Sequence, residues 1–238
     1  MNISAKNLDF RELNARVRTS GESVQIDHCC GQRFIGCGLD EKTIAIQGTP
    51  GNALGAYLNG AVIKVHGNTQ DAVGDTMNDG KIIIDGSAGD ALGYAMRGGS
   101  IFVRGNVGYR TGIHMKEYMD KKPAILVGGN TGNFLGEYLA GGIIVVLGLD
   151  SDKVPIGNFT GTGMHGGKIF VRTRQEITGL PAQVTTEIAT DDDLLAISPL
   201  LYEFSAHFDM NAEKILQDQF YVLKPNVENP YRQLYVIN

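Results

Sequence analysis

The stretch Gly93-Tyr94-Ala95-Met96-Arg97-Gly98-Gly99-Ser100-Ile101-Phe102-Val103 decides the fold, because its pattern recurs along most of the chain. Its first glycine belongs to a series with a spacing of 19 residues. Five glycines keep that spacing, and two more continue the series after short insertions: Gly36, Gly55, Gly74, Gly93 and Gly112, then Gly136 and Gly161. A fixed period of this length is typical of repeat architectures.

Further columns accompany each glycine of the series. Leucine or methionine follows three residues later, at Leu39, Leu58, Met77, Met96, Met115, Leu139 and Met164. Isoleucine comes next in every unit, at Ile44, Ile63, Ile82, Ile101, Ile125, Ile144 and Ile169. A β-branched residue stands two positions beyond it, at Ile46, Val65, Ile84, Val103, Val127, Val146 and Val171. Glycine closes most units, at Gly48, Gly67, Gly86, Gly105, Gly129 and Gly148.

These columns predict the path of the chain. The Ile-x-Val spacing has a period of two, so both side chains point to one face of a short strand. A 19-residue unit is too short for a strand and a crossover helix, and each unit therefore forms one turn of a coil. We expect two or three short strands per turn, joined by glycine bends. Stacked turns then carry inward aliphatic ladders and outward polar rows.

The predicted fold class is all-β. Because parallel crossovers are right-handed, we predict a single-stranded, right-handed parallel β-helix (β-solenoid) of about seven rungs over residues 31–173. At roughly 4.8 Å per rung it forms a rod of about 34 Å. Three parts follow: an N-terminal lead-in or cap over 1–30, the β-helix over 31–179, and a helical and extended C-terminal cap over 180–238. The caps cover the open ends of the ladder.

Both flanks lack the glycine columns. Residues 23–27 are expected to be an extended lead-in. Beyond residue 180 the composition becomes helical: residues 191–193 can cap a first turn, and Pro199 after Ser198 has the pattern of a helix start. Residues 211–217 predict a second short helix, and residues 220–223 a strand.

Composition excludes several classes of function. The chain has 238 residues, a net charge of −5 and a pI near 5.5, which argues against nucleic-acid and anionic-membrane partners. No apolar run approaches 18 residues, and the start at 1–6 lacks a signal peptide, so we expect a cytoplasmic protein. Thirty-two glycines exceed the usual share of about 7%. Three cysteines do not make a disulfide framework.

Serine and glycine motifs give no convincing catalytic or nucleotide site. Ser87 and Ser100 do not lie in a Gly-x-Ser-x-Gly elbow. Residues 161–166 match G-x-G-x-x-G, but the dinucleotide fingerprint needs a following helix. Here a strand in register with every other rung follows, so we interpret this match as part of the repeat.

The cysteines and histidines are candidates for metal binding. The spacing of Cys29, Cys30 and Cys37, with His28 beside them, does not match zinc or iron–sulfur sites, and we interpret the three as small buried thiols. The remaining candidates, His66, His114 and His165, fall in different columns of rungs two, five and seven. Rungs two apart are separated by about 10 Å, too far for shared ligation. We therefore predict no metal site.

A column of Asp and Asn is the remaining candidate for chemistry. Asp71 and Asp90 occupy it on neighbouring rungs, with Asn52, Asn133 and Asn158 at the same position elsewhere. A carboxylate pair is able to catalyse acid–base steps, but Asn and Asp beside glycine are also what bends require. We favour the structural role. No catalytic, cofactor-binding or metal-binding residue is therefore predicted.

Two insertions interrupt the period, at residues 116–122 and 149–154. Insertions in a solenoid project from one face, which is often the binding face. The first one is charged, with Lys116, Glu117, Asp120, Lys121 and Lys122. Docking of a partner and a solvated bulge are both compatible with it.

The repeat resembles a known family. The unit Gly-x-x-[Leu/Met]-x-Gly-Gly-x-Ile, present at 93–101, 136–144 and 161–169, is similar to the GXGXG domain, the C-terminal β-helix of the large subunit of glutamate synthase. Residues 14–17 look like the family's lead-in, 105–110 like its middle rung and 220–225 like its C-terminal strand, and the closest segment is 136–148. The resemblance covers essentially the whole chain.

The resemblance implies a structural role. In that family the β-helix carries no catalytic residue, flavin or cluster, and holds the glutaminase and FMN synthase domains around an ammonia path. This sequence has no N-terminal cysteine nucleophile and no FMN barrel. It therefore looks like a separate scaffold subunit of a glutamate-synthase-type complex, with a class II glutaminase-like and an FMN-binding subunit as partners. FMN and an iron–sulfur cluster are expected on those partners, and a homo-oligomer is compatible with the sequence.

Two alternatives remain open. The same β-helix occurs as one of the subunits of formylmethanofuran dehydrogenase, so the scaffold has a second candidate complex. A free-standing hydrolase that uses a groove of the solenoid is the third hypothesis. It conflicts with the lack of a readable nucleophile–base pair.

Overall fold

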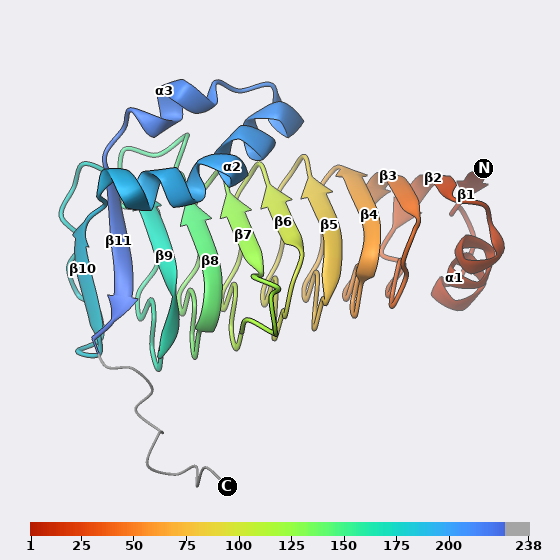
Figure 1. Cartoon of the computed structure of the whole chain (residues 1–238). Helices are drawn as coiled ribbons and strands as arrows, with labels where there is room; N and C mark the ends of the chain where they lie inside the picture. Colours follow the sequence, from red (N-terminus) through yellow and green to blue (C-terminus); the bar gives the residue numbers. More distant parts are fainter. Residues whose placement is uncertain (227–238) are drawn as a thin grey trace, which may run out of the picture.

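The computed structural model describes residues 1–226 and shows one 11-stranded sheet that runs along an elongated coil (Figure 1). The strand order is β1-β2-β3-β4-β5-β6-β7-β8-β9-β11-β10. The strands are β1 (Asn2–Ser4), β2 (Ser23–Cys30), β3 (Thr43–Thr49), β4 (Asn59–His66), β5 (Asp79–Ile84), β6 (Ser100–Val103), β7 (Ala124–Val127), β8 (Ala140–Val146), β9 (Gly166–Arg172), β10 (Val184–Ile188) and β11 (Phe220–Pro225). The helices are α1 (Phe10–Thr19), α2 (Asp191–Phe208) and α3 (Ala212–Leu216).

The predicted isoleucine ladder is confirmed. From β1 to β9 the neighbours are parallel, and each isoleucine pairs with the isoleucine of the next turn, as Ile82 does with Ile101 and Ile101 with Ile125. These side chains have no exposed surface. The parallel β-solenoid of the expected size is therefore the fold of this chain.

The glycine series has a steric cause. Gly93 has a φ of +69°, and a Cβ built on it would lie 2.4 Å from Cδ1 of Ile125 in the following turn. The other members make the same approach to the isoleucine ladder, and at Gly161 the neighbour is Cγ2 of Val184, 2.8 Å away. Val184 of β10 thus continues the ladder beyond the last repeat. Glycine is required at this column both by the positive φ and by the lack of space.

Each turn contributes one strand, so the expectation of two or three strands is wrong. Outside the sheet the backbone alternates between left-handed and other conformations, for example at Ala91, Gly93 and Ala95. Such a backbone bends instead of extending, and its N–H groups donate to the previous turn, as Gly93 N does to Val73 O over 2.7 Å. A left-handed residue with a Cβ costs roughly 1–2 kcal/mol.

The N-terminal flank is more regular than expected. β1 pairs in parallel with β2, and α1 stands between them. The helix begins after Asp9, whose carboxylate accepts hydrogen bonds from the backbone N–H groups of Arg11 and Glu12. Its Leu13 and Val17 are buried in the interior cluster of the coil. This flank therefore closes the open end of the ladder, and the sequence pattern did not predict the helix.

The C-terminal cap confirms the short helix and the strand but corrects one prediction. Pro199 does not start a helix: α2 begins at Asp191 with Thr190 as its N-cap, and Pro199 lies inside it. Proline lacks the N–H that would donate to Leu195 O. The hydroxyl of Ser198 donates to that carbonyl instead, over 2.9 Å, so the helix continues past the proline.

Helix α2 covers the outward side of the sheet in the C-terminal half of the coil (Figure 1). The outward row is therefore not polar throughout, contrary to expectation. It is apolar where α2 lies over it, at Ile83, Phe102, Leu126, Val145 and Phe170. These residues form a second buried cluster with Ile197, Leu201 and Phe204 of α2.

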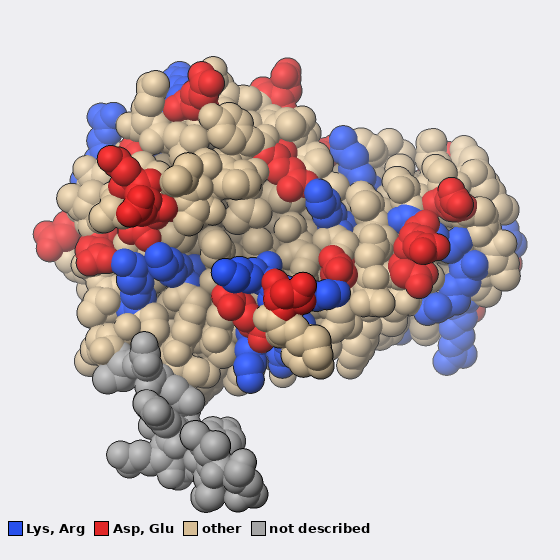
Figure 2. Space-filling view, viewed as in Figure 1, with Lys and Arg blue, Asp and Glu red and all other residues tan. Residues whose placement is uncertain are grey.

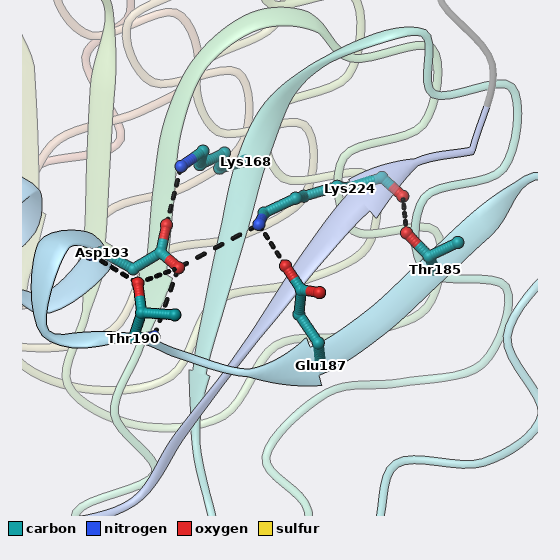
Figure 3. Close-up of polar contacts among 6 residues, drawn as sticks. All are labelled: Lys168, Thr185, Glu187, Thr190, Asp193 and Lys224. Atoms are coloured by element: carbon teal, nitrogen blue, oxygen red, sulfur yellow. Dashed lines mark hydrogen bonds and ion pairs between the residues drawn. The ribbon is translucent and has the colours of Figure 1, made fainter.

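Figure 3 shows how the start of α2 is fixed to the sheet. Lys168 Nζ of β9 donates to Asp193 Oδ1 over 2.7 Å, and the backbone N–H of Asp193 donates to Thr190 Oγ1 over 3.2 Å. Lys224 of β11 lies 4.0 Å from Asp193 Oδ2 and pairs with Glu187 of β10. Burial raises the pKa of Asp193, but the hydrogen bonds from Lys168 and Thr190 outweigh it and hold this pKa below its usual range.

Candidate functional site

The Asp and Asn column is structural, as interpreted from the sequence. Asp90 N donates to Asp71 Oδ1 over 2.9 Å, and Asn158 N donates to Asn133 Oδ1 over 2.9 Å. Asn52 Oδ1 accepts from Asp71 N in the same way. Each side chain thereby bonds the backbone of the next turn, and the pair of carboxylates does not converge on a shared site.

A second ladder of this kind was missed. Asn68 Oδ1 accepts from Ser87 N over 2.8 Å, Ser87 Oγ accepts from Asn106 N over 3.0 Å, and Asn106 Oδ1 accepts from Asn130 N over 2.8 Å. The signal was present in the sequence, because all four residues directly follow a unit-closing glycine. Ser87, weighed as a nucleophile, belongs to this ladder.

The cysteines are free thiols. Burial raises the pKa of Cys29 to about 11, so this thiol stays protonated at neutral pH. Cys30 is exposed, so the prediction of three buried thiols is wrong for it, and Cys37 is half-buried. Across residues 1–226, no three side chains of His, Cys, Asp or Glu form a group able to hold a metal ion.

The three histidines lie in separate environments. His66 Nδ1 at the end of β4 is 2.6 Å from Asp85 Oδ2 of the next turn, a pair that sequence reasoning missed. In a hydrolase such a dyad would orient a serine, threonine or cysteine. No hydrogen bond joins His66 to one of these in the described part of the chain. His114 stacks on an aromatic ring, and His165 Nδ1 lies 3.0 Å from Gly163 O.

The G-x-G-x-x-G match is part of the repeat, as predicted. Residues 161–165 form a turn, and β9 starts at Gly166. No helix follows this glycine run, so the backbone N–H groups that would bind a pyrophosphate at a helix N-terminus are not provided here.

The first insertion, residues 116–122, is fixed to the coil at both ends. Lys121 Nζ donates to Asp79 Oδ2 over 2.8 Å, and Gly142 N donates to Glu117 Oε1 over 3.1 Å. The hydrogen bond from Lys121 lowers the pKa of Asp79. Between these contacts the tip carries Tyr118 and Met119, whose exposed fractions are 56% and 84%. The insertion is therefore a braced projection with an apolar tip.

The second insertion, residues 149–154, is mostly packed against the protein. Leu149 contacts the cluster under α2, and Val154 contacts the interior cluster. Beside it lies a polar cleft of 290 Å³ lined by Ser151, Asp152, Lys153, Arg172, Thr173, Arg174, Gln175, Asp218 and Gln219. Arg172 is already bound there, since its Nε donates to Asp218 Oδ2 over 2.6 Å.

The surface gives no sign of a large charged patch. On the face shown in Figure 2, Lys and Arg are interspersed with Asp and Glu. Among the described helices, none is long and apolar enough to cross a membrane. The site built from these observations is a set of docking elements on a rigid coil.

Comparisons with known proteins agree with the repeat. The GXGXG motif family matches residues 8–227. The chain is 40% identical over 248 residues to the uncharacterized protein MJ1350 of Methanocaldococcus jannaschii, covering 98% of this chain and 95% of that protein. A chain of the formyltransferase/hydrolase complex (FhcABCD) from Methylorubrum extorquens, solved with methylofuran, shares the fold with a TM-score of 0.63 and 21% identity, covering 91% of this chain and 87% of that one. The motif match over nearly all of the described residues shows that this chain belongs to the GXGXG family.

Proposed function

We propose that this chain is a non-catalytic scaffold subunit of a glutamate-synthase-type oxidoreductase complex in the cytoplasm. The observation that carries the proposal is the use of its polar side chains. Asp71, Asp90, Ser87 and Asn106, which chemistry would need, hold one turn to the next. A rod stiffened in this way is suited to keep other subunits at fixed positions.

The partners in this proposal are a class II glutaminase-like subunit and an FMN-binding synthase-like subunit. FMN and an iron–sulfur cluster belong to those partners, and this chain binds none of them. The braced tip of the first insertion, Tyr118 and Met119, is one point at which a partner docks. The GXGXG family match supports this role.

Co-expression tests the proposal directly. The chain is produced with the glutaminase-like and FMN-binding subunits encoded in its own genome, and complexes are measured by size-exclusion chromatography with light scattering. We expect a defined complex that makes glutamate from glutamine. Omitting this chain should leave glutamine hydrolysis intact and abolish glutamine-dependent glutamate formation. If the purified chain binds neither subunit, the proposal is wrong.

A second candidate is supported by the similarity to a chain of the formyltransferase/hydrolase complex. In that case the scaffold is a counterpart of the β-helical subunit of formylmethanofuran dehydrogenase. The same co-expression with formyltransferase- and hydrolase-type subunits separates the two. Binding to those subunits in place of the glutaminase-like and FMN-binding ones assigns the chain to the second complex.

A further inference from the structure

The turns opposite the ladder carry bulky side chains in an unfavourable backbone conformation. Two columns have positive φ in every repeat. The first contains Phe34, Ala53, Ala72, Ala91, Arg110, Phe134 and Phe159, and the second contains Gly38, Tyr57, Thr76, Ala95, His114, Tyr138 and Gly163. Glycine or asparagine suits such positions best. Strained residues that persist are a reason to look for a function.

In the C-terminal turns these residues contact one another. The rings of His114 and Tyr138 stack with centroids 5.0 Å apart and an angle of 8°, and Tyr94 meets His114 edge-on at 6.0 Å. Phe134 and Phe159 stack at 5.1 Å. The guanidinium of Arg110 lies 5.0 Å from the centroid of Phe134. We name the aromatic ridge after these six residues: Tyr94, Arg110, His114, Phe134, Tyr138 and Phe159.

The aromatic ridge is open to solvent. Tyr94 is 39% exposed and Phe159 is 55% exposed, whereas Phe102 and Phe170 on the sheet side are fully buried under α2. The aromatic rings of the described chain thus fall into a covered group and an uncovered one. Exposed rings gathered in one patch are typical of protein interfaces.

The charge of the ridge indicates what covers it. Arg110 Nε donates to Glu137 Oε2 over 3.0 Å, so the cation has its counter-ion within this chain. A partner therefore needs no acidic group opposite Arg110. Tyrosine, phenylalanine and arginine, with few free charges, are the residues found at the centre of stable interfaces. Moreover, the first insertion leaves the coil at Lys116, two residues after His114, which places a second apolar projection next to the ridge.

We propose that the aromatic ridge is the docking site of a partner protein subunit whose contact face is apolar and uncharged. The proposal rests on the scaffold function above, and the partner is one of the two subunits named there. The rings lie on a backbone held by inter-turn hydrogen bonds, as His114 N to Glu137 O over 2.9 Å. The ridge is thereby preordered, and little conformational entropy is lost when a partner binds.

A triple variant tests the ridge without destroying the fold. Phe134→Asn, Tyr138→Asn and Phe159→Asn place a residue that tolerates positive φ at three strained positions. We expect the thermal midpoint to change by only a few degrees. Affinity for the co-purified partner subunit should fall by roughly a hundredfold in isothermal titration calorimetry, because several central aromatic anchors are removed.

The matched control is Ala72→Asn with Thr76→Asn. These residues have positive φ in the same two columns but lie outside the ridge, and we expect unchanged affinity. If wild type binds a partner subunit and the triple variant binds as tightly, the ridge proposal alone is overturned. If wild type binds neither subunit, the scaffold function and the ridge proposal both fall. A wild-type dimer that the triple variant converts to a monomer assigns the ridge to a second copy of this chain and overturns the heterologous partner.

Discussion

The two halves of the sheet differ on the outward side although their inward sides are the same. In β3 and β4 the outward positions paired in register are Ala45 and Lys64, neither of which belongs to a buried cluster. In β6 to β9 the equivalent positions include Phe102 and Phe170, both fully buried under α2. The repeat therefore fixes only the interior. The outer face follows whichever element the cap places on it.

The largest expected effect breaks this comparison at one register position. Phe102→Ala removes a fully buried ring that packs beneath α2 and lies 5.3 Å from the ring of His207. We expect the free energy of unfolding to fall by about 3–5 kcal/mol. Lys64→Ala, two turns earlier in the same outward row, should change it by less than about 0.5 kcal/mol. Urea denaturation followed by circular dichroism measures both, and equal losses would contradict the division into two halves.

The interior should respond alike in both halves. Gly55→Ala and Gly93→Ala each place a Cβ 2.6 and 2.4 Å from an isoleucine Cδ1 of the following turn, at a positive φ. Left-handed strain and overpacking together should lower the free energy of unfolding by roughly 2–4 kcal/mol at both positions. Chemical denaturation of the two variants provides the measurement. A large loss at Gly93 alone would mean that only the covered half has a tightly packed interior.

The anchor of α2 gives the covered half a dependence on pH. Because the pKa of Asp193 in the folded protein lies below its value in the unfolded chain, the carboxylate stabilises the fold above about pH 4. This stabilisation is lost as the pH falls through the folded-state pKa. Asp193→Asn should cost about 1–3 kcal/mol at pH 7, and the difference from wild type should shrink below pH 4. Thermal unfolding across pH 3–7 tests this, with Asp192→Asn, an exposed neighbour, as the control.

The sequence predicts those parts of the fold that the repeat determines. Gly93, Ile101 and Val103 report the interior directly, because a stacked turn repeats the same steric demand on every rung. The position of Pro199 could not be deduced, since its tolerance inside α2 depends on the hydroxyl of Ser198 reaching Leu195 O. Local patterns do not reveal a carbonyl that finds another donor.

The candidate site was less predictable for a related reason. The insertions at 116–122 and 149–154 are visible as breaks in the period, but their environments differ only in three dimensions. The aromatic ridge draws Tyr94, Phe134 and Phe159 from different repeats, and none of them belongs to an invariant column. The pairing of His66 with Asp85 likewise needed the register of β4 and β5.

The smallest expected effect concerns the brace of the first insertion. Lys121→Ala removes the contact with Asp79 Oδ2 at 2.8 Å, an ion pair in which both side chains are over a third exposed. Such a pair contributes about 0.2–1 kcal/mol, so global stability should hardly change. The segment 116–122 should nevertheless be cleaved faster by trypsin at Lys116 or Lys122, because Lys121 also bonds Asn78 O and holds the projection against earlier turns. Lys153→Ala, in the second insertion, serves as the control and should leave this cleavage unchanged. Unaltered proteolysis of the Lys121 variant would show that Glu117 and Gly142 alone are sufficient to hold the projection in place.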